Sequence, residues 1–126
     1  MNTLTLSVGS NSRDREWQMK HGIEWLKHIF SDVKVSSIYN SVAVNGRDAD
    51  YLNAVMTATT KQDLESTIAL MKQYESVCGR TPASKLQGVI PIDIDIVMWN
   101  DDVIRPGDFA QQYFQRGWQE LKTVEL

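Results

Sequence analysis

Hydrophobic residues repeat with two different periods along this chain, and segments of the two kinds alternate. Residues 3–8 place apolar side chains at every second position, which is typical of a β-strand, and the Gly9-Ser10-Asn11-Ser12 segment ends that pattern. Residues 13–30 instead place them three or four positions apart, which predicts an amphipathic helix. The apolar positions of that helix are Met19, Ile23, Leu26 and Phe30.

The middle of the chain repeats the order of strand and helix. Residues 33–42 and 51–59 are rich in β-branched side chains and flank a turn-forming segment at 45–48, so they predict an antiparallel strand pair. A second helix is expected to begin at a cap on Thr60 and to end at Gly79. A loop then leads to one more strand.

Two carboxylates interrupt the apolar run of that last strand, residues 89–99. Asp93 and Asp95 are two positions apart, so on a strand both side chains point to one face, while the neighbouring isoleucines point to the other. Paired carboxylates suit a divalent cation such as Mg²⁺, which completes its oxygen shell with substrate phosphates and water. The same alternation is also typical of an antiparallel strand with one solvated face, so the strand alone leaves both interpretations open.

The order β-α-β-β-α-β predicts an α+β fold, a ferredoxin-like sandwich in which two helices cover one face of a four-stranded antiparallel sheet. Residues 1–126 fit a single domain, because this length with 42% hydrophobic content suffices for one core. The tail after Ile104 is expected to form a mixed turn and a short helix. This fold serves many activities and does not specify a function.

Composition narrows the classes of partner. A formal net charge of −3 argues against nonspecific nucleic-acid binding, which needs a dense basic surface. The chain has no apolar run of the roughly 18 residues that span a bilayer, and its first residues lack the pattern of a secretion signal. We therefore expect a cytoplasmic protein without membrane contact, as a monomer or a small homo-oligomer.

Six segments of the chain carry motifs of one enzyme family. They are Gly9-Ser10-Asn11, Ser36-Ser37-Ile38-Tyr39, Asp50-Tyr51-Leu52-Asn53-Ala54, Glu75 with Gly79-Arg80, Ile92-Asp93-Ile94-Asp95-Ile96, and Arg116-Gly117-Trp118. In this order they resemble a short, divergent member of the 6-hydroxymethyl-7,8-dihydropterin pyrophosphokinase family over nearly the whole chain. The resemblance implies Mg²⁺-dependent transfer of pyrophosphate from ATP to the hydroxymethyl group of that pterin in folate biosynthesis, with ATP and a reduced pterin as partners.

The resemblance also implies a role for each matching residue. Asp93 and Asp95 would hold two Mg²⁺ ions that bridge the ATP phosphates. The implied catalytic residues are Asp95, Arg80 and Arg116; the implied substrate-binding residues are Gly9, Tyr51, Asn53 and Trp118; and the implied nucleotide-binding residues are Glu75, Arg80 and Ile96.

The chemistry of these residues supports the roles without requiring them. Tyr51 and Asn53 share a strand face and would offer an aromatic wall and an amide to a pterin edge, although an ordinary half-buried strand start has the same pattern. Glu75 falls on the buried side of its helix and therefore needs a partner. With Arg80 it would form either part of a nucleotide site or a helix-terminal ion pair.

Several positions depart from the family pattern. Gln87 and Ile90 stand where the family has a tryptophan and an arginine, Pro82 replaces a second arginine, and Ala110 and Gln111 replace a His-Tyr pair. One charge contact in phosphoryl transfer is worth on the order of a thousandfold in rate, so several losses would leave a slow enzyme or none. The alternative function is therefore a catalytically weak or inactive relative that binds a pterin or a nucleotide as a regulatory module.

Overall fold

The computed structural model describes the backbone of residues 1–124 and the side chains of residues 1–123. The elements follow one another as β1 (Asn2–Ser10), α1 (Arg15–Ile29), β2 (Ser31–Val35), β3 (Tyr39–Ser41), β4 (Tyr51–Thr60), α2 (Leu64–Val77), α3 (Pro82–Leu86), β5 (Asp93–Trp99), β6 (Asp102–Val103), α4 (Pro106–Phe109) and α5 (Gln112–Val124). The chain is therefore an α+β protein, as predicted. Within the described part, no helix is long and apolar enough to cross a membrane.

Four predicted boundaries were wrong. The last strand, expected at 89–99, begins only at Asp93 in β5. The strand expected at 33–42 divides into β2 and β3, because the N–H and hydroxyl of Ser37 each donate to the Glu120 carboxylate at 2.8 Å. The cap of α2 is Asp63, whose carboxylate accepts a backbone N–H of the first helical turn at 2.8 Å, whereas Thr60 ends β4. The tail forms α4 and then α5, which has 13 residues and is longer than the short helix expected.

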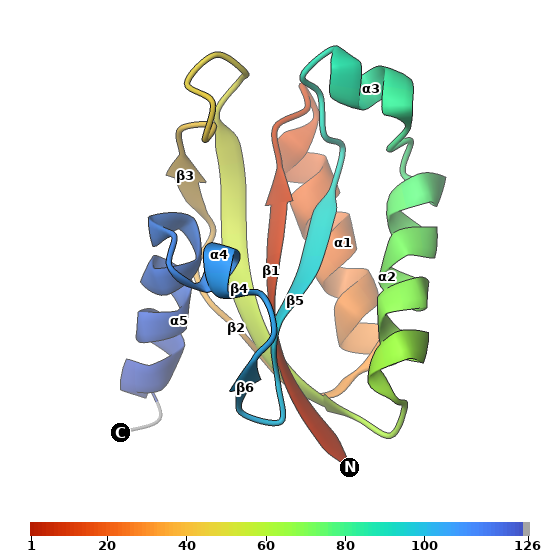
Figure 1. Cartoon of the computed structure of the whole chain (residues 1–126), viewed down its shortest axis with the longest axis vertical. Helices are drawn as coiled ribbons and strands as arrows, with labels where there is room; N and C mark the ends of the chain where they lie inside the picture. The colour runs from red at the N-terminus through yellow and green to blue at the C-terminus, as the bar shows by residue number, and fades with distance from the viewer. Residues whose placement is uncertain (125–126) are drawn as a thin grey trace.

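All strands belong to one antiparallel sheet in the order β2-β4-β1-β5-β6, and β3 also pairs with β4 (Figure 1). The four predicted strands correspond to β1, to β2 with β3, to β4 and to β5. The sheet has six strands within the described residues, because one predicted strand is divided in two and the short β6 is added. Between β5 and β6, Asn100 and Asp101 have φ angles of 50° and 72°, as a tight type I′ hairpin turn requires.

Helices α1 and α2 cover one face of the sheet, as predicted (Figure 1). Their apolar side chains meet those of β1, β4 and β5 in the main core. Its largest fully buried members include Leu6, Met19, Leu26, Met56, Met71, Ile92 and Ile94. The apolar periods of the sequence thus converge on this one layer, which contains most of the buried hydrophobic residues.

The opposite face carries a helix that the predicted sandwich lacks, because α5 packs on β4 there. The buried residues of this smaller core are Val55, Val97, Phe114 and Leu121. Close approach requires Gly117, since a Cβ at that position would lie 2.6 Å from Val55 Cγ2. The Tyr39 hydroxyl donates to the Tyr113 carbonyl at 2.5 Å and accepts the Gly117 N–H at 3.1 Å. Tyr39 thus inserts between two successive turns of α5 and fixes its position.

Candidate functional site

Strand β5 places Asp93 and Asp95, here called the acid pair, on the sheet face opposite the main core. The alternating isoleucines, of which Ile96 is the most exposed at 4%, belong to that core. In the register of the sheet, Asp93 lies beside Gly9 and Asp95 beside Ser7 of β1. The predicted division of this strand into an apolar face and an acidic face is confirmed.

Asp95 is only 9% exposed and faces two cationic side chains. Lys72 Nζ lies 3.9 Å and Arg105 Nη2 lies 3.8 Å from Asp95 Oδ1. Burial, together with the charge of Asp93 and a hydrogen bond to its carboxyl group, raises the pKa of Asp95 to about 7, and the two cations offset only part of this rise. A further cation at the acid pair would therefore be stabilising.

Arg80 joins Asp93 to Glu75. Its Nη1 lies 2.6 Å from Asp93 Oδ1 and 3.2 Å from Glu75 Oε2, and the same Glu75 oxygen accepts the Ile94 N–H at 2.7 Å. Burial raises the pKa of Glu75, while the Ile94 N–H and the charges of Arg80 and Lys72 act in the opposite direction. The ion-pair interpretation of Glu75 and Arg80 is thus confirmed, and their role toward a nucleotide stays a prediction.

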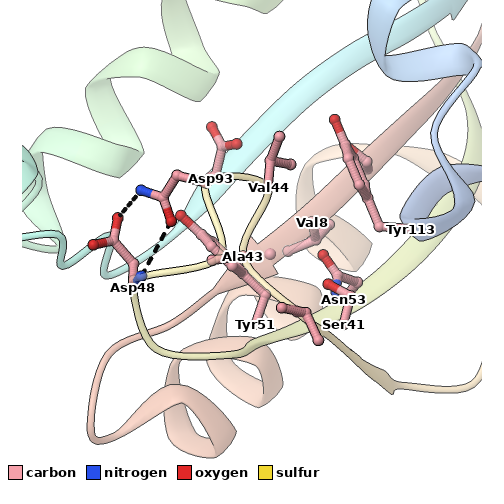
Figure 2. Close-up of a pocket in the computed structure, with 13 residues that line it drawn as sticks. Val8, Ser41, Ala43, Val44, Asp48, Tyr51, Asn53, Asp93 and Tyr113 are labelled. Atoms are coloured by element: carbon pink, nitrogen blue, oxygen red, sulfur yellow. Dashed lines mark hydrogen bonds between the residues drawn. The ribbon is translucent and has the colours of Figure 1, made fainter.

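A cavity of about 360 Å³, the larger of two described here, opens beside Asp93 (Figure 2). Its walls are the ends of β1 and β4, the loop 42–50, and one residue of α5, Tyr113. Figure 2 shows Tyr51, Asn53, Asp93 and Tyr113 arranged around it. Three residues with a predicted substrate-binding role, Gly9, Tyr51 and Asn53, therefore lie together on one cavity.

Gly9 contributes space rather than a chemical group. Asn53 Nδ2 donates to Ser41 Oγ at 2.5 Å, and Asn53 Oδ1 would lie 3.2 Å from a Cβ at position 9. Any side chain there would press on the amide. Burial, followed by the charge of Asp93, raises the pKa of Tyr51, so its phenol remains a neutral donor at pH 7.

A second, smaller cavity of about 210 Å³ lies between α2 and β5. Its lining combines apolar with charged side chains: Ile68, Met71, Lys72, Ile94, Asp95, Ile96, Ile104 and Arg105. The Ile94 N–H points away from β1 toward Glu75. Backbone groups two residues apart on a strand point in the same direction, so the backbone of Ile96 faces the same outer edge of β5. Apolar walls, a strand edge and two cations are surfaces that suit a purine ring and phosphate groups.

Lys72, Arg105 and Tyr113 also line this site, although none of them belongs to a sequence motif given above. Arg105 Nε donates to Asp108 Oδ2 at 2.6 Å, and the Tyr113 hydroxyl donates to the other carboxylate oxygen of Asp108. Asp108 therefore links a cation of the smaller cavity to a wall of the larger one. Lys72 had a sequence signal, because it precedes Glu75 by one helical turn, whereas Arg105 and Tyr113 lie in the less regular tail.

Arg116 and Trp118 lie elsewhere. The Arg116 guanidinium is 4.7 Å from the centre of the Tyr39 ring, on which it stacks. Trp118 packs against Phe109 in the smaller core, with ring centroids 5.0 Å apart. Neither residue lines either cavity. Both residues belong to α5, which Gly117 and Tyr39 hold on β4. The catalytic role of Arg116 and the substrate-binding role of Trp118 stay predictions.

The residues that depart from the family pattern have structural positions of their own. Ile90 is 9% exposed and belongs to the interior. Pro82 is the first residue of α3, and Gln87 caps its other end. Ala110 caps α4, and Gln111 follows it. The cations that face the acid pair come instead from three places: Lys72 in α2, Arg80 three residues after the end of α2, and Arg105 directly before α4.

The carboxylates of the acid pair suit a metal ion that binds together with the phosphate groups of a substrate. Among the described residues there is no group of three or more His, Cys, Asp or Glu side chains that could hold a metal ion alone. Mg²⁺ usually takes one or two protein carboxylates and completes its shell with phosphate oxygens and water. Asp93 and Asp95 lie on the same face of β5 and meet that requirement.

Comparisons with known proteins agree with the residues found here. The sequence profile of the 7,8-dihydro-6-hydroxymethylpterin-pyrophosphokinase family matches residues 5–123. A curated relative from Aquifex aeolicus (strain VF5), named 2-amino-4-hydroxy-6-hydroxymethyldihydropteridine pyrophosphokinase, is 34% identical over 106 residues, which are 83% of this chain and 66% of that relative. The chain thus matches part of the length of that relative. On this evidence the chain belongs to the 7,8-dihydro-6-hydroxymethylpterin-pyrophosphokinase family.

Proposed function

We propose that this protein transfers pyrophosphate from ATP to the hydroxymethyl group of 6-hydroxymethyl-7,8-dihydropterin in folate biosynthesis. The observation that carries the proposal is the place of the acid pair between two cavities, with Asp93 on the larger and Asp95 on the smaller. Transfer between two substrates requires both to be held side by side, with charge stabilisation where they meet. Family membership supports the identity of the substrates.

The pterin is assigned to the larger cavity. Its volume of about 360 Å³ lies in the range of small-molecule sites. The ring edge of a pterin alternates hydrogen-bond donors and acceptors, which an amide such as Asn53 matches because it offers both. Tyr51 and Tyr113 provide aromatic surface on the walls. In this assignment Tyr113 replaces Trp118 as the aromatic contact from α5.

ATP is assigned to the smaller cavity. The isoleucines suit its purine, the edge of β5 at Ile96 offers backbone groups to the purine's polar edge, and Lys72 and Arg105 face the phosphates. Asp93 and Asp95 would hold two Mg²⁺ ions, which neutralise charge on the phosphates during transfer. Arg80, beside Asp93, would bind a phosphate oxygen at the junction of the cavities.

In the chemical step, the pterin hydroxyl oxygen forms a bond to the β-phosphorus of ATP. The bond from that phosphorus to the oxygen shared with the α-phosphate breaks, AMP leaves with both electrons of that bond, and the hydroxyl proton passes to solvent. The protein's part is to align the two substrates and to place cations around the developing charge. The proposal includes a cytoplasmic location. It also includes a monomer or small homo-oligomer, and sedimentation of the purified protein would test this oligomeric state.

A binding protein without turnover is the second candidate, and one observation favours it. The family has an arginine at the position of Ile90, which here is buried and interacts through its backbone with Asn11. No cation reaches the acid pair from that position. Such a protein would bind a pterin or a nucleotide as a regulatory module and release no product.

Analysis of the nucleotide products separates the two functions. With MgATP and reduced hydroxymethylpterin the protein should release AMP, and omission of the pterin should stop that release. Asp95→Asn should lower the rate by about a thousandfold while circular dichroism stays unchanged. Asp102→Asn, on the exposed strand β6, is the matched control and should keep the rate. Absence of AMP from a folded protein that still binds either ligand would favour the second function.

A further inference from the structure

A buried amide, Asn11, connects two loops at one end of the sheet. Asn11 directly follows β1 and is 3% exposed. Figure 1 shows the loop between β3 and β4 and the segment around α3 at that same end. The residue belongs to the Gly9-Ser10-Asn11 motif, yet it lines neither cavity described above. Its role therefore has to be found in its hydrogen bonds.

Asn11 uses every polar atom of its side chain on those loops. Its Oδ1 accepts the Ile90 N–H at 2.6 Å, and its own N–H donates to the Ile90 carbonyl at 3.2 Å. Its Nδ2 donates to the Gly88 carbonyl at 2.8 Å and to the Ala49 carbonyl at 3.5 Å. An N–H can only donate and a carbonyl can only accept, so these partners fix the orientation of the amide.

A second contact joins the same loops. Gly88 has a φ of 75°, and a Cβ there would lie 2.4 Å from Asp48 Oδ1. Asp48 is held in turn by Asn45, whose Nδ2 donates to Asp48 Oδ2 at 2.8 Å. Only glycine allows the two loops to approach this closely without strain. The connection through Asn11 is therefore part of a larger contact between the loops.

Both loops lead to the candidate site. The loop 42–50 supplies a wall of the larger cavity through Val42, Ala43, Val44, Asn45 and Asp48. The segment 87–92 runs directly into β5 and so sets where Asp93 begins that strand. A shift of either loop would change the distance between a molecule in the larger cavity and the acid pair.

We propose that Asn11 is a positioning residue that holds the wall of the larger cavity and the segment leading to Asp93 in one arrangement. The identity of the ligand rests on the proposed function, whereas the coupling of the loops rests on the hydrogen bonds alone. The amide does this from the interior, without touching either ligand.

Hydrogen–deuterium exchange on the free protein tests the coupling. Asn11→Asp keeps the acceptor for the Ile90 N–H but removes the donor to Gly88 and Ala49. The rate of amide exchange should rise by about tenfold in both 43–49 and 86–90. Local opening of these loops would no longer require the hydrogen bonds from the residue 11 side chain to the Gly88 and Ala49 carbonyls to break. Asn2→Asp is the matched control: its Nδ2 donates to the Gln62 carbonyl at 2.8 Å, at the other end of β1, so both loops should keep their protection.

A rise confined to one loop, or a rise of equal size in β1 and β4, would overturn the proposal, since the first denies coupling and the second indicates a general loss of stability. If Asn11→Asp does not fold, Gly88→Ala serves instead, because its Cβ would push on Asp48 and should expose both loops together. Exchange that stays unchanged in one of the two loops of that variant would equally count against the coupling.

A binding measurement separates this inference from the proposed function. Calorimetric titration with 6-hydroxymethyl-7,8-dihydropterin should show about tenfold weaker binding to Asn11→Asp and unchanged binding to Asn2→Asp. Equal affinity of both variants would show that the amide does not position the cavity wall. If the unmodified protein does not bind the pterin, the proposed function fails, and the exchange experiment alone decides whether Asn11 couples the loops.

Discussion

The two cavities that meet at the acid pair differ in charge. The residues that line the larger one include the carboxylates of Asp48 and Asp93 and no cation, next to neutral polar groups such as Asn53. The smaller one is lined by Lys72 and Arg105 among isoleucines. A neutral ring with a patterned polar edge suits the first, and a polyphosphate with a flat base suits the second. The acid pair lies where the two kinds of surface join.

The cavities also differ in how their walls are built. The smaller cavity is lined mainly by α2 and β5, whose backbone hydrogen bonds hold side chains in place. The larger cavity takes one wall from the loop 42–50, which depends on contacts such as those of Asn11. The ligand affinity of the larger cavity should therefore respond to changes far from it, whereas that of the smaller cavity should respond mainly to its own charges.

The largest effect on ligand binding is expected from the loss of the Asn53 amide in the larger cavity. Asn53→Ala should weaken pterin binding by about a hundredfold, because the polar edge of a buried ligand would be left without its partner. MgATP binding should change by less than about twofold, since the smaller cavity does not contain Asn53. Titration calorimetry measures both. Asn40→Ala, an exposed asparagine of β3, is the control, and equal losses for the two ligands would break the distinction between the cavities.

The acid pair should make stability depend on pH when no metal is present. Burial and Asp93 raise the pKa of Asp95 from 3.8 to about 7, so the folded state binds this proton more tightly than the unfolded state does. Its contribution to stability is complete below the unfolded pKa and is lost as the pH rises toward 7. Asp95→Asn removes this dependence on pH. The free energy of unfolding of the variant, minus that of the unmodified protein, should therefore increase by about 2 kcal/mol from pH 4 to pH 8.

Urea denaturation in Mg²⁺-free buffer at several pH values gives this difference directly. A difference that stays constant with pH would mean that Asp95 titrates normally and that the acid pair does not strain the fold. Adding Mg²⁺ with ATP should then stabilise the unmodified protein more than Asp95→Asn, because a cation between the carboxylates relieves their repulsion.

A smaller effect is expected from the cations of the smaller cavity. Arg105→Gln should weaken MgATP binding by about tenfold and leave pterin binding unchanged, because it removes a charged donor that faces Asp95. Arg116→Gln should change MgATP affinity by less than about twofold, since that guanidinium stacks on Tyr39. Tryptophan fluorescence titration compares the two variants. A larger loss for Arg116→Gln would support the catalytic role that the sequence motif implies and would contradict the position of α5.

The parts of the site that the sequence predicted are those that depend on local patterns. Asp93, Asp95, Tyr51 and Asn53 were identified correctly as sharing strand faces because the alternation of a strand is a local pattern. Glu75 was recognised because an acid on a buried helical position needs a partner, and it has Arg80 and the Ile94 N–H. These inferences need only the residues within a few positions of one another.

The docking of the tail could not be predicted in this way. The Arg116-Gly117-Trp118 motif implies a ligand site, and nothing in it indicates that Gly117 also brings α5 onto β4, a contact between residues far apart in the chain. Arg105 reaches Asp95 only because β6 turns the chain back and Asp108 holds its side chain. Tertiary contacts of this kind leave no periodic signal in the sequence.

The smallest expected effect tests the space that Gly9 leaves for Asn53. Gly9→Ala would place a Cβ 3.2 Å from Asn53 Oδ1, so the amide has to shift by a few tenths of an ångström. A shift of that size should weaken pterin binding by about fivefold, less than the loss of the amide itself, and should spare MgATP binding. Gly107→Ala is a matched control, because a Cβ there meets nothing within 4 Å. If both glycine variants bind the pterin equally well, the larger cavity tolerates displacement of its walls, and its contrast with the smaller cavity would rest on charge alone.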